Sequence, residues 1–265
     1  MNEIFEVLQL KTDISVYNIN FIRNLIEHRM MDLSINEVAE YGAYIAGDAV
    51  ELDVLTAMLK NSFSQFFRNR LTFEVLGQVV LPSLIIKNTD TSEVRVWSVA
   101  CAGGHEPYSL AIVFEKFNKA SAVKFKYRIF ATDRDYHEIE RAVVGIFSSS
   151  DIGNLSNLET AHWFEPIGKN YKIKAELKKN IQFELFDLLQ NSSLCPRSSI
   201  FGSFDFIMCA NVLIYYNEKT QRQIVSNLKK CISTNGYIIS GETERDVFLS
   251  ANFKEVFPQS CIFKL

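Results

Sequence analysis

One stretch of the chain, "VWSVACAGGHEPYSLAIVFEKF" at 96–117, changes its hydrophobic period within a few residues. At its start, Val94, Val96 and Ser98 alternate with their neighbours, as on one face of a β-strand. At its end, apolar residues recur three or four positions apart, as on one face of a helix. Small residues at 100–104 separate the two parts. The stretch therefore predicts a strand, a tight turn and a helix, in that order.

The same alternation continues to the end of the chain. Short apolar strand patterns are "KYRIFATD", "FDFIMCANVLIYY", "GYIISGE" and "SCIFKL", and helical patterns between them include "YHEIERAVVG" and "TQRQIVSNLKKCI". Such alternation predicts an α/β domain whose mainly parallel sheet is covered by helices on both faces. We assign 76–265 to this domain, and the 265 residues suffice for one large domain or a large and a small one.

The N-terminal part, 1–75, has only helical periods and predicts a helical domain of its own. Ser34 followed by Glu37 has the spacing of a capping box, which predicts a helix N-terminus there. One apolar stripe at helical spacing consists of Ile19, Ile22, Ile26 and Met30.

The stretch at 146–182 interrupts the alternation of the larger domain. Its pieces "YKIKA" and "NIQFEL" alternate like antiparallel strands. We interpret 146–182 as a small β-subdomain inserted into the α/β domain.

Composition excludes several classes of protein. A net charge of -3 gives no indication of nucleic-acid or anionic-membrane binding. No apolar run reaches the roughly 18–20 residues of a membrane helix, and the acidic start does not resemble a signal peptide. The five cysteines are scattered without a CxxC pair, and the four histidines have no metal-ligand spacing. We expect reduced thiols, a cytoplasmic location, no metal and no membrane insertion.

The turn at 100–104 is a candidate ligand site, because open parallel sheets bind ligands beyond the carboxyl ends of their strands. Small residues such as Ala100 let the backbone approach a ligand, and Gly103 and Gly104 can take positive φ. The turn lacks GxGxxG and a Walker lysine, which makes a dehydrogenase or a phosphate cradle less favoured. The alternative is an ordinary tight turn without a ligand.

The next strand ends in "ATDRD", which places Asp133 where an acidic residue commonly binds ribose hydroxyls. The alternative role for Asp133 is the N-cap of the following helix, a position that Asp135 can also fill. A small-residue turn followed by this acid indicates a nucleoside ligand. Without a phosphate grip, S-adenosylmethionine fits better than NAD.

Four motifs resemble those of the CheR-type chemotaxis-receptor methyltransferases. The first motif of that family resembles "RVWSVACAGGHEPYSLAI". Three others resemble "FSQFFRN", "FDFIMCANVLIYY" and "GYIISGETE", and the order of the motifs matches over 15–265. The resemblance implies a helical N-terminal domain, a class I (Rossmann-like) methyltransferase domain and an inserted β-subdomain. It also implies methyl transfer from S-adenosylmethionine to a glutamate of a protein acceptor, such as a chemoreceptor or related signalling protein, with S-adenosylhomocysteine as product.

The resemblance also implies site residues. Donor contacts fall on Glu106 at the methionine amino end, Asp133 at the ribose, Asp187 and Leu188 at the adenine, Asn211 and Val212 at the methyl-donor pocket, and Ser64 and Arg68 at the closing side. A glutamate acceptor is already ionised at neutral pH, so the reaction needs positioning and not a general base. Arg68 can orient the carboxylate, and Tyr215 can place a hydroxyl beside the methyl group. The alternatives are a surface arginine and a packed aromatic ring.

The chain departs from the family pattern at four positions, which are Gly103, His105, Ala210 and Glu242. Residues 1–60 also carry only four basic residues against ten acidic ones. In the family a basic face of this domain docks on acidic receptor helices, so an acidic face predicts a neutral or basic partner surface. The lysines of the insertion predict either a second docking surface or protection of a sheet edge. Two other functions stay open: the same fold with another acceptor, and a non-catalytic donor-binding module.

Overall fold

The computed structural model describes residues 1–60, 64–87, 93–190, 193–200 and 203–265. Contacts divide the chain into two compact units. The first comprises 1–62 with 213–223, and the second comprises 63–212 with 224–265. The contacts therefore group residues 63–75 with the sheet, whereas the sequence places a domain boundary at residue 75.

The first unit is helical. Its helices are α1 (Asn2–Lys11), η1 (Ile14–Val16), α2 (Ile19–Asp32), α3 (Val38–Gly47), α4 (Ala49–Met58) and η4 (Leu213–Tyr215). Ile22, Ile26 and Met30 of the predicted stripe are buried, whereas Ile19 in the first turn of α2 is 44% exposed. The predicted capping box is wrong, because α3 begins at Val38 with no side-chain cap and Ser34 has a φ of 57°.

A buried ion pair holds α2 against α4 in the first unit. The Arg29 guanidinium donates two hydrogen bonds of 2.8 Å to the Glu51 carboxylate, which is 3% exposed. The Tyr41 hydroxyl donates a third, also 2.8 Å long, to Glu51. Lys11 pairs with Asp53. Two of the four basic residues in 1–60 are therefore engaged by acidic residues of the same unit.

A distant segment completes the first unit. The rings of Tyr17 and Tyr216 stack with centroids 5.6 Å apart, and Tyr215 packs edge-on against Phe21 at 4.9 Å. The Asn217 backbone N–H donates to the Val16 carbonyl at 3.0 Å. Residues that follow a strand of the second unit thus supply part of the first unit's packing.

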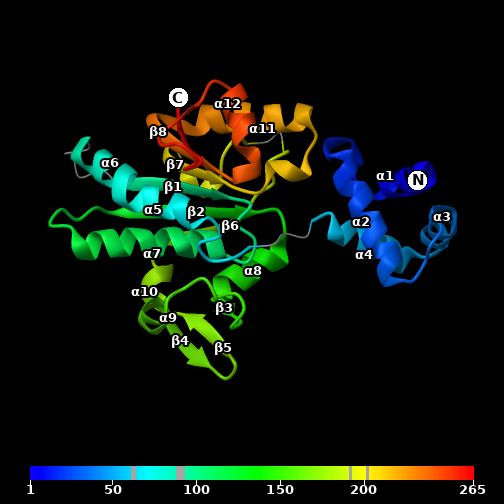
Figure 1. Ribbon diagram of the computed structural model, residues 1–265, viewed down its shortest axis with the longest axis horizontal. Helices are drawn as coiled ribbons and strands as arrows, with labels where there is room; N and C mark the ends of the chain where they lie inside the picture. Colours follow the sequence, from blue (N-terminus) through cyan, green and yellow to red (C-terminus); the bar gives the residue numbers. More distant parts are fainter. Residues whose placement is uncertain (61–63, 88–92, 191–192, 201–202) are drawn as a thin grey trace. The chain divides into compact units, whose positions relative to one another are not determined.

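The second unit contains a seven-stranded sheet of order β6-β2-β1-β7-β8-β10-β9. β10 is antiparallel to both of its neighbours, and the other paired strands are parallel. Figure 1 shows α7 and α8 on one face of this sheet and α11 and α12 on the other. The predicted α/β class is therefore confirmed. The strands are β1 (Val94–Val99), β2 (Tyr127–Asp133), β6 (Ile181–Leu185), β7 (Phe204–Cys209), β8 (Ile232–Ser240), β9 (Lys254–Glu255) and β10 (Ile262–Lys264).

Helices of the second unit cover the sheet and build the connections. They are α5 (Arg70–Val75), the π-helix η2 (Leu76–Val80), α6 (Leu81–Lys87), α7 (His105–Ala120), α8 (Tyr136–Val144), α9 (Asn157–Trp163), α10 (Ala175–Lys178), η3 (Arg197–Ser199), η5 (Glu242–Glu244) and α12 (Arg245–Ser250). α11 (Glu218–Cys231) begins in the first unit and continues into the second from Ile224. Large aromatic side chains, among them Phe114, Phe130 and Phe206, are fully buried in this unit. In the part of the chain that the structure describes, we find no helix long and apolar enough to span a bilayer.

A separate three-stranded antiparallel sheet lies within the predicted insertion. Its strands β3 (Ile146–Phe147), β5 (Asn170–Ile173) and β4 (Phe164–Ile167) are neighbours in that order. The interpretation of "NIQFEL" as an antiparallel strand is wrong, because this segment forms β6 and pairs in parallel with β2. As an edge strand, β6 is only partly covered, so it keeps the alternation that buried parallel strands lose.

Candidate functional site

Predicted site residues meet at the carboxyl end of the large sheet. Val99 pairs with Thr132 across β1 and β2, and the Cys101 N–H donates to the Thr132 carbonyl at 2.8 Å. On the other side of β2, the Phe186 N–H donates to the Asp133 carbonyl at 2.8 Å. The turn after β1, the end of β2 and the segment after β6 therefore lie side by side.

The turn after β1 is held in an unusual backbone conformation. Ala100 and Ala102 have left-handed φ values of 52° and 47°, and Gly104 has a φ of 91°. Of the two glycines that can take positive φ, Gly104 does so and Gly103 does not. Left-handed alanines are strained and persist only where neighbours hold them. Here the Ala102 N–H donates to the Asp133 carboxylate at 2.9 Å.

The two adjacent glycines provide a matched test of this turn. We expect Gly104→Ala to lower the free energy of unfolding by at least about 1–2 kcal/mol, because the backbone at position 104 has a positive φ that strains alanine. A Cβ there would also lie 2.9 Å from the Ala142 Cβ. At Gly103 an added Cβ would meet the flexible Glu138 carboxylate at 3.3 Å, so Gly103→Ala should cost less than half as much. Urea denaturation of both variants measures this, and equal losses would contradict the assignment.

Asp133 does not cap the following helix. Asp135 is the N-cap of α8 and accepts from the His137 N–H, while Asp133 accepts from the N–H groups of Ala102 and Asp135, each at 2.9 Å. Burial raises the pKa of Asp133, and these two hydrogen bonds oppose the rise. Asp133 thus fixes the turn and presents a carboxylate at the strand end.

Glu106 follows the turn in the first turn of α7 and is partly buried. It accepts from the Ser98 hydroxyl at 2.7 Å. Burial raises the pKa of Glu106 to about 8, and the negative charge of Glu244 adds to this rise. The Ser98 hydrogen bond and the positive charge of Arg68 lower the pKa. A bound cation would stabilise the ionised form of a carboxyl group whose pKa is raised by burial.

The segment 64–68 is anchored beside α7. Phe66 is fully buried and its ring meets the His105, Phe147 and Phe164 rings edge-on, with centroids 4.8–5.4 Å away. The Phe67 N–H donates to the Ser109 hydroxyl at 3.1 Å. This anchoring leaves Arg68 exposed, with its charge acting on Glu106, and leaves Ser64 half-buried two residues before Phe66.

The remaining predicted residues have the following surroundings. Asp187 is exposed after β6 and accepts from the Leu189 N–H at 2.9 Å, and Leu188 beside it is half-buried. Asn211 follows β7 with a φ of 60°, and Val212 is buried. Tyr215 belongs to the first unit, where it packs on Phe21, so its role beside the methyl group stays a prediction.

Comparison with known proteins decides the family. The sequence model described as "CheR methyltransferase, SAM binding domain" matches residues 62–261. The chain belongs to the CheR methyltransferase family. A chemotaxis protein methyltransferase of Listeria monocytogenes is 30% identical over 236 residues, which cover 89% of this chain and 85% of the relative. One of Borreliella burgdorferi is 28% identical, covering 83% and 79%. A probable biofilm formation methyltransferase, WspC, of Pseudomonas aeruginosa is 25% identical, covering 100% and 62%.

S-adenosylmethionine is the cofactor of this CheR methyltransferase, and the predicted donor residues suit its chemistry. That donor has a cationic sulfonium and an ammonium group, a ribose and an adenine. The sheet edge presents a carboxyl group with raised pKa at Glu106, a buried acid at Asp133 and an exposed acid at Asp187. Acidic groups next to a turn of small side chains suit this ligand, and the described residues hold no cluster of metal ligands.

The sequence did not single out Glu244, which contacts the predicted site residue Asn211. Glu244 is 1% exposed, and its Oε2 accepts from the N–H groups of Gly241 and Asn211 at 2.9 and 2.7 Å. Gly241 is required there, because an added Cβ would lie 2.7 Å from the Asn211 Nδ2. Glu244 therefore fixes the left-handed Asn211 at the end of β7. The available signal was the last residue of the motif "GYIISGETE".

Two departures from the family pattern have structural partners in this chain. Glu242 accepts from the Asn69 Nδ2 at 2.9 Å and so ties η5 to the start of α5. His105 is buried against Phe66 and Phe147, and its Nε2 lies 3.6 Å from the Asp151 Oδ1. Burial lowers the pKa of His105, while the Asp151 charge opposes this. A neutral imidazole here packs the turn against the segment that precedes α9.

Proposed function

We propose that this methyltransferase esterifies glutamate side chains of a protein acceptor, a chemoreceptor or a related signalling protein. The observation that carries the proposal is the placement of Arg68. Its positive charge acts on Glu106 next to the donor turn, on a segment anchored by the buried Phe66. The relatives named chemotaxis protein methyltransferases support the same function.

Each site residue has a part in this proposal. When bound, S-adenosylmethionine supplies an electrophilic methyl group. Glu106 holds its amino end, Asp133 binds the ribose hydroxyls, and the segment at 187–188 flanks the adenine. Arg68 binds the acceptor carboxylate through two parallel hydrogen bonds and orients it. The acceptor needs no deprotonation at neutral pH, so positioning and exclusion of water supply the rate enhancement.

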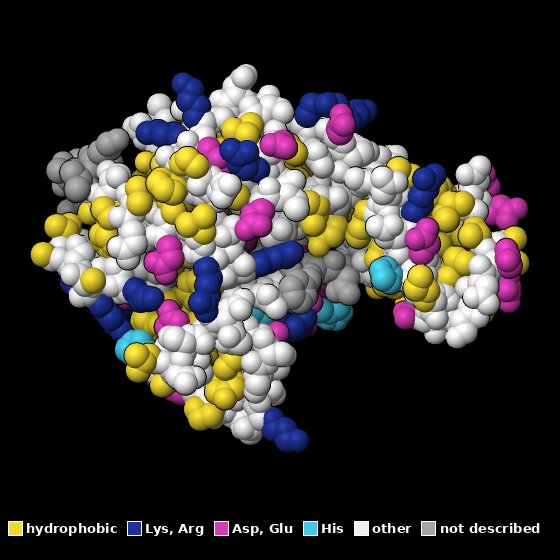
Figure 2. Space-filling model, viewed as in Figure 1, with side chains coloured by type: hydrophobic (Ala, Val, Ile, Leu, Met, Phe, Trp, Pro, Cys, Tyr) yellow, Lys and Arg dark blue, Asp and Glu magenta, His cyan; other side chains and the backbone are white. Residues whose placement is uncertain are grey.

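The charge of the first unit bears on the acceptor. Figure 2 shows that acidic side chains outnumber basic ones on the visible face of this unit. Because Lys11 and Arg29 are paired within the unit, few of its cations are left for an acidic partner. We infer that the partner surface facing this unit is neutral or basic, since an acidic helix would be repelled.

The lysines of the insertion divide into two groups. Lys174 donates to the Ala161 and His162 carbonyls, and Lys178 donates to the Val143 and Val144 carbonyls. Lys174 therefore ties the end of β5 to α9, and Lys178 ties α10 to the last turn of α8. Lys169, Lys172 and Lys179 are left as the candidates for a docking surface. The five cysteines are free thiols, which supports a reducing compartment such as the cytoplasm.

A second candidate function is methylation of a different signalling protein by the same site. The observation that favours it is the acidic first unit, and a relative is named a probable biofilm formation methyltransferase. Incubation with methyl-labelled donor and extract of the source cells separates the candidates. Label released by mild base from a chemoreceptor supports the first, and label on another protein supports the second. Donor binding without any labelled product would favour a non-catalytic module.

Arg68→Ala tests the catalytic site directly. We expect methyl transfer to fall at least tenfold, a barrier increase of about 1.4 kcal/mol, because the acceptor carboxylate loses its orienting group. The melting temperature should change little, because the Arg68 side chain is exposed. The matched control is Arg128→Ala, which removes another exposed arginine, paired with Glu93 next to the start of β1. Full activity in the Arg68 variant would assign this residue to the surface.

A further inference from the structure

A cavity lies in the sheet-containing unit, and none of the predicted donor residues lines it. Its volume is about 640 Å³, and it is bounded by α5, η2 and the start of α6 on one side and by α7 on the other. The segment before α9 closes one end through Asn154 and Ser156. Cavities of this size hold small molecules or the side chains of a partner.

The floor of the cavity is aromatic. Phe67, Phe73 and Phe117 line it together with Val113 and Gly77. Gly77 belongs to the π-helix η2, a type of helical turn that is rare and often found at functional sites. An added Cβ at Gly77 would approach the Val113 Cγ1 to 3.3 Å, so glycine lets η2 and α7 come close at the floor.

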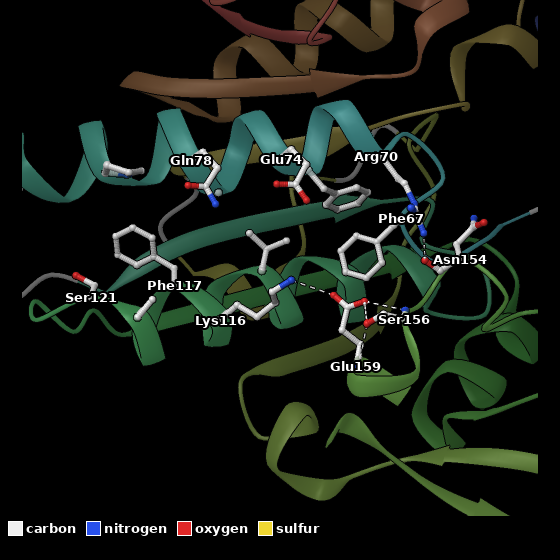
Figure 3. A pocket seen from close by; sticks show the side chains of 15 residues that line it. Phe67, Arg70, Glu74, Gln78, Lys116, Phe117, Ser121, Asn154, Ser156 and Glu159 are labelled. Atoms are coloured by element: carbon white, nitrogen blue, oxygen red, sulfur yellow. Dashed lines mark hydrogen bonds and ion pairs between the residues drawn. The ribbon is translucent and has the colours of Figure 1, made fainter. Parts of the chain in front are cut away.

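Most charged groups at the rim are satisfied within the protein. Lys116 donates to Glu159 at 3.0 Å, and Glu159 also accepts from the Ser156 N–H at 2.9 Å. Arg70 donates to the Asn154 carbonyl at 2.6 Å. Figure 3 shows these pairs at the end of the cavity near Phe67.

Glu74 and Gln78 differ from the other rim residues. They lie one helical turn apart, line the cavity and are exposed. Among the residues that the structure describes, neither the Glu74 nor the Gln78 side chain has a hydrogen-bond or ion-pair partner. The Glu74 carboxylate and the Gln78 amide oxygen therefore offer acceptors beside aromatic rings (Figure 3). A carboxylate above phenylalanine rings is a combination that attracts an organic cation.

We propose that this cavity binds an organic cation, a primary ammonium or guanidinium group carried on an apolar body. The apolar body lies on Phe67, Phe73 and Phe117, and the cationic group binds Glu74, with Gln78 accepting a further hydrogen bond. The site is separate from donor binding and does not depend on the acceptor proposed above.

The test uses phenethylammonium as probe and the full chain saturated with S-adenosylhomocysteine, so that the donor site is filled. Its neutral analogue 2-phenylethanol and its anionic analogue 3-phenylpropionate are titrated in parallel by ligand-observed NMR. We expect phenethylammonium to bind at least tenfold more tightly than either analogue. E74Q should remove this preference and weaken the probe at least tenfold, and A120W, which narrows the cavity next to Phe117, should weaken all three ligands.

The matched control is E176Q in α10, which neutralises an exposed glutamate that does not line the cavity and should leave probe binding unchanged. The proposal is overturned if wild-type protein shows no saturable binding of phenethylammonium. Equal or tighter binding of 3-phenylpropionate would instead assign the cavity to anions through Arg70 and Lys116. Probe binding that is much tighter to the ligand-free protein than to the protein saturated with S-adenosylhomocysteine, or equal effects of E74Q and E176Q, would also overturn it.

Discussion

Raising the pH from 6 to 7.5 is expected to tighten binding of S-adenosylhomocysteine about tenfold per pH unit. The reason is that Glu106, with a pKa raised to about 8 by burial, is protonated in this range before the ligand binds. The ligand's ammonium group favours the ionised carboxylate, so binding must release a proton. Calorimetry in buffers of different ionisation enthalpy measures both the affinity and the proton.

Glu106→Gln is the control for this linkage. The variant should bind with little pH dependence and release no proton. The ligand-free protein gives an independent check, because the folded pKa of Glu106 lies above the unfolded value of about 4.5. Its contribution to stability is therefore full below pH 4.5 and is lost as the pH rises through about 8. A wild-type affinity that is flat with pH, or a slope that persists in the variant, would remove Glu106 from the donor site.

Asp133→Ala should weaken binding of S-adenosylhomocysteine by about 1–3 kcal/mol, which is about 5–150-fold, because the ribose hydroxyls lose a buried acceptor. The same carboxylate holds the Ala102 N–H, so part of the loss could come from the turn. Calorimetric titration of wild type and variant gives the size of the effect.

A double-mutant cycle separates the two contributions. The second change is made in the ligand, by removing the ribose hydroxyls of S-adenosylhomocysteine. If Asp133 binds those hydroxyls, the variant should bind the deoxygenated ligand nearly as well as wild type does, and the two losses should not add. Additive losses would restrict Asp133 to holding the turn. Asp135→Ala, which removes the cap of α8, should reduce stability and leave donor affinity unchanged.

Hydrophobic periods predicted the α/β sheet and the position of the donor turn, because buried strand faces and helix stripes are set by local spacing. The errors arose where contacts between distant parts of the chain determine the strand pairing or the start of a helix. Whether "NIQFEL" pairs with β2 or with the small sheet depends on a partner 52 residues earlier in the chain, at Ile129–Asp133. Ser34 has a side chain suited to capping, but its backbone is left-handed and it does not cap α3. The next helix, α4, is capped by the Asp48 side chain.

Among the predicted site residues, Asp133 could be found because it ends a strand pattern, and Glu106 because it lies in the motif "RVWSVACAGGHEPYSLAI". Glu244 is distant in sequence from Asn211, and only the folded chain shows that it fixes Asn211. No pattern in the sequence indicated the cavity between α5, η2 and α7. Glu74 and Gln78 have the spacing of an ordinary exposed helix face, and the aromatic floor combines Phe67 and Phe73 with the distant Phe117 of α7.

The segment 213–223 has a consequence for synthesis. Ser15 and Asn217, which share a hydrogen bond, are 202 residues apart in the chain, so at about 5–20 residues per second the ribosome needs roughly 10–40 s between them. During that interval α1 to α4 exist while Tyr17 and Phe21 lack the rings of Tyr216 and Tyr215. The first helices to emerge therefore complete their packing only after most of the sheet has been translated, and a nascent chain shorter than about 220 residues exposes that aromatic surface to chaperones.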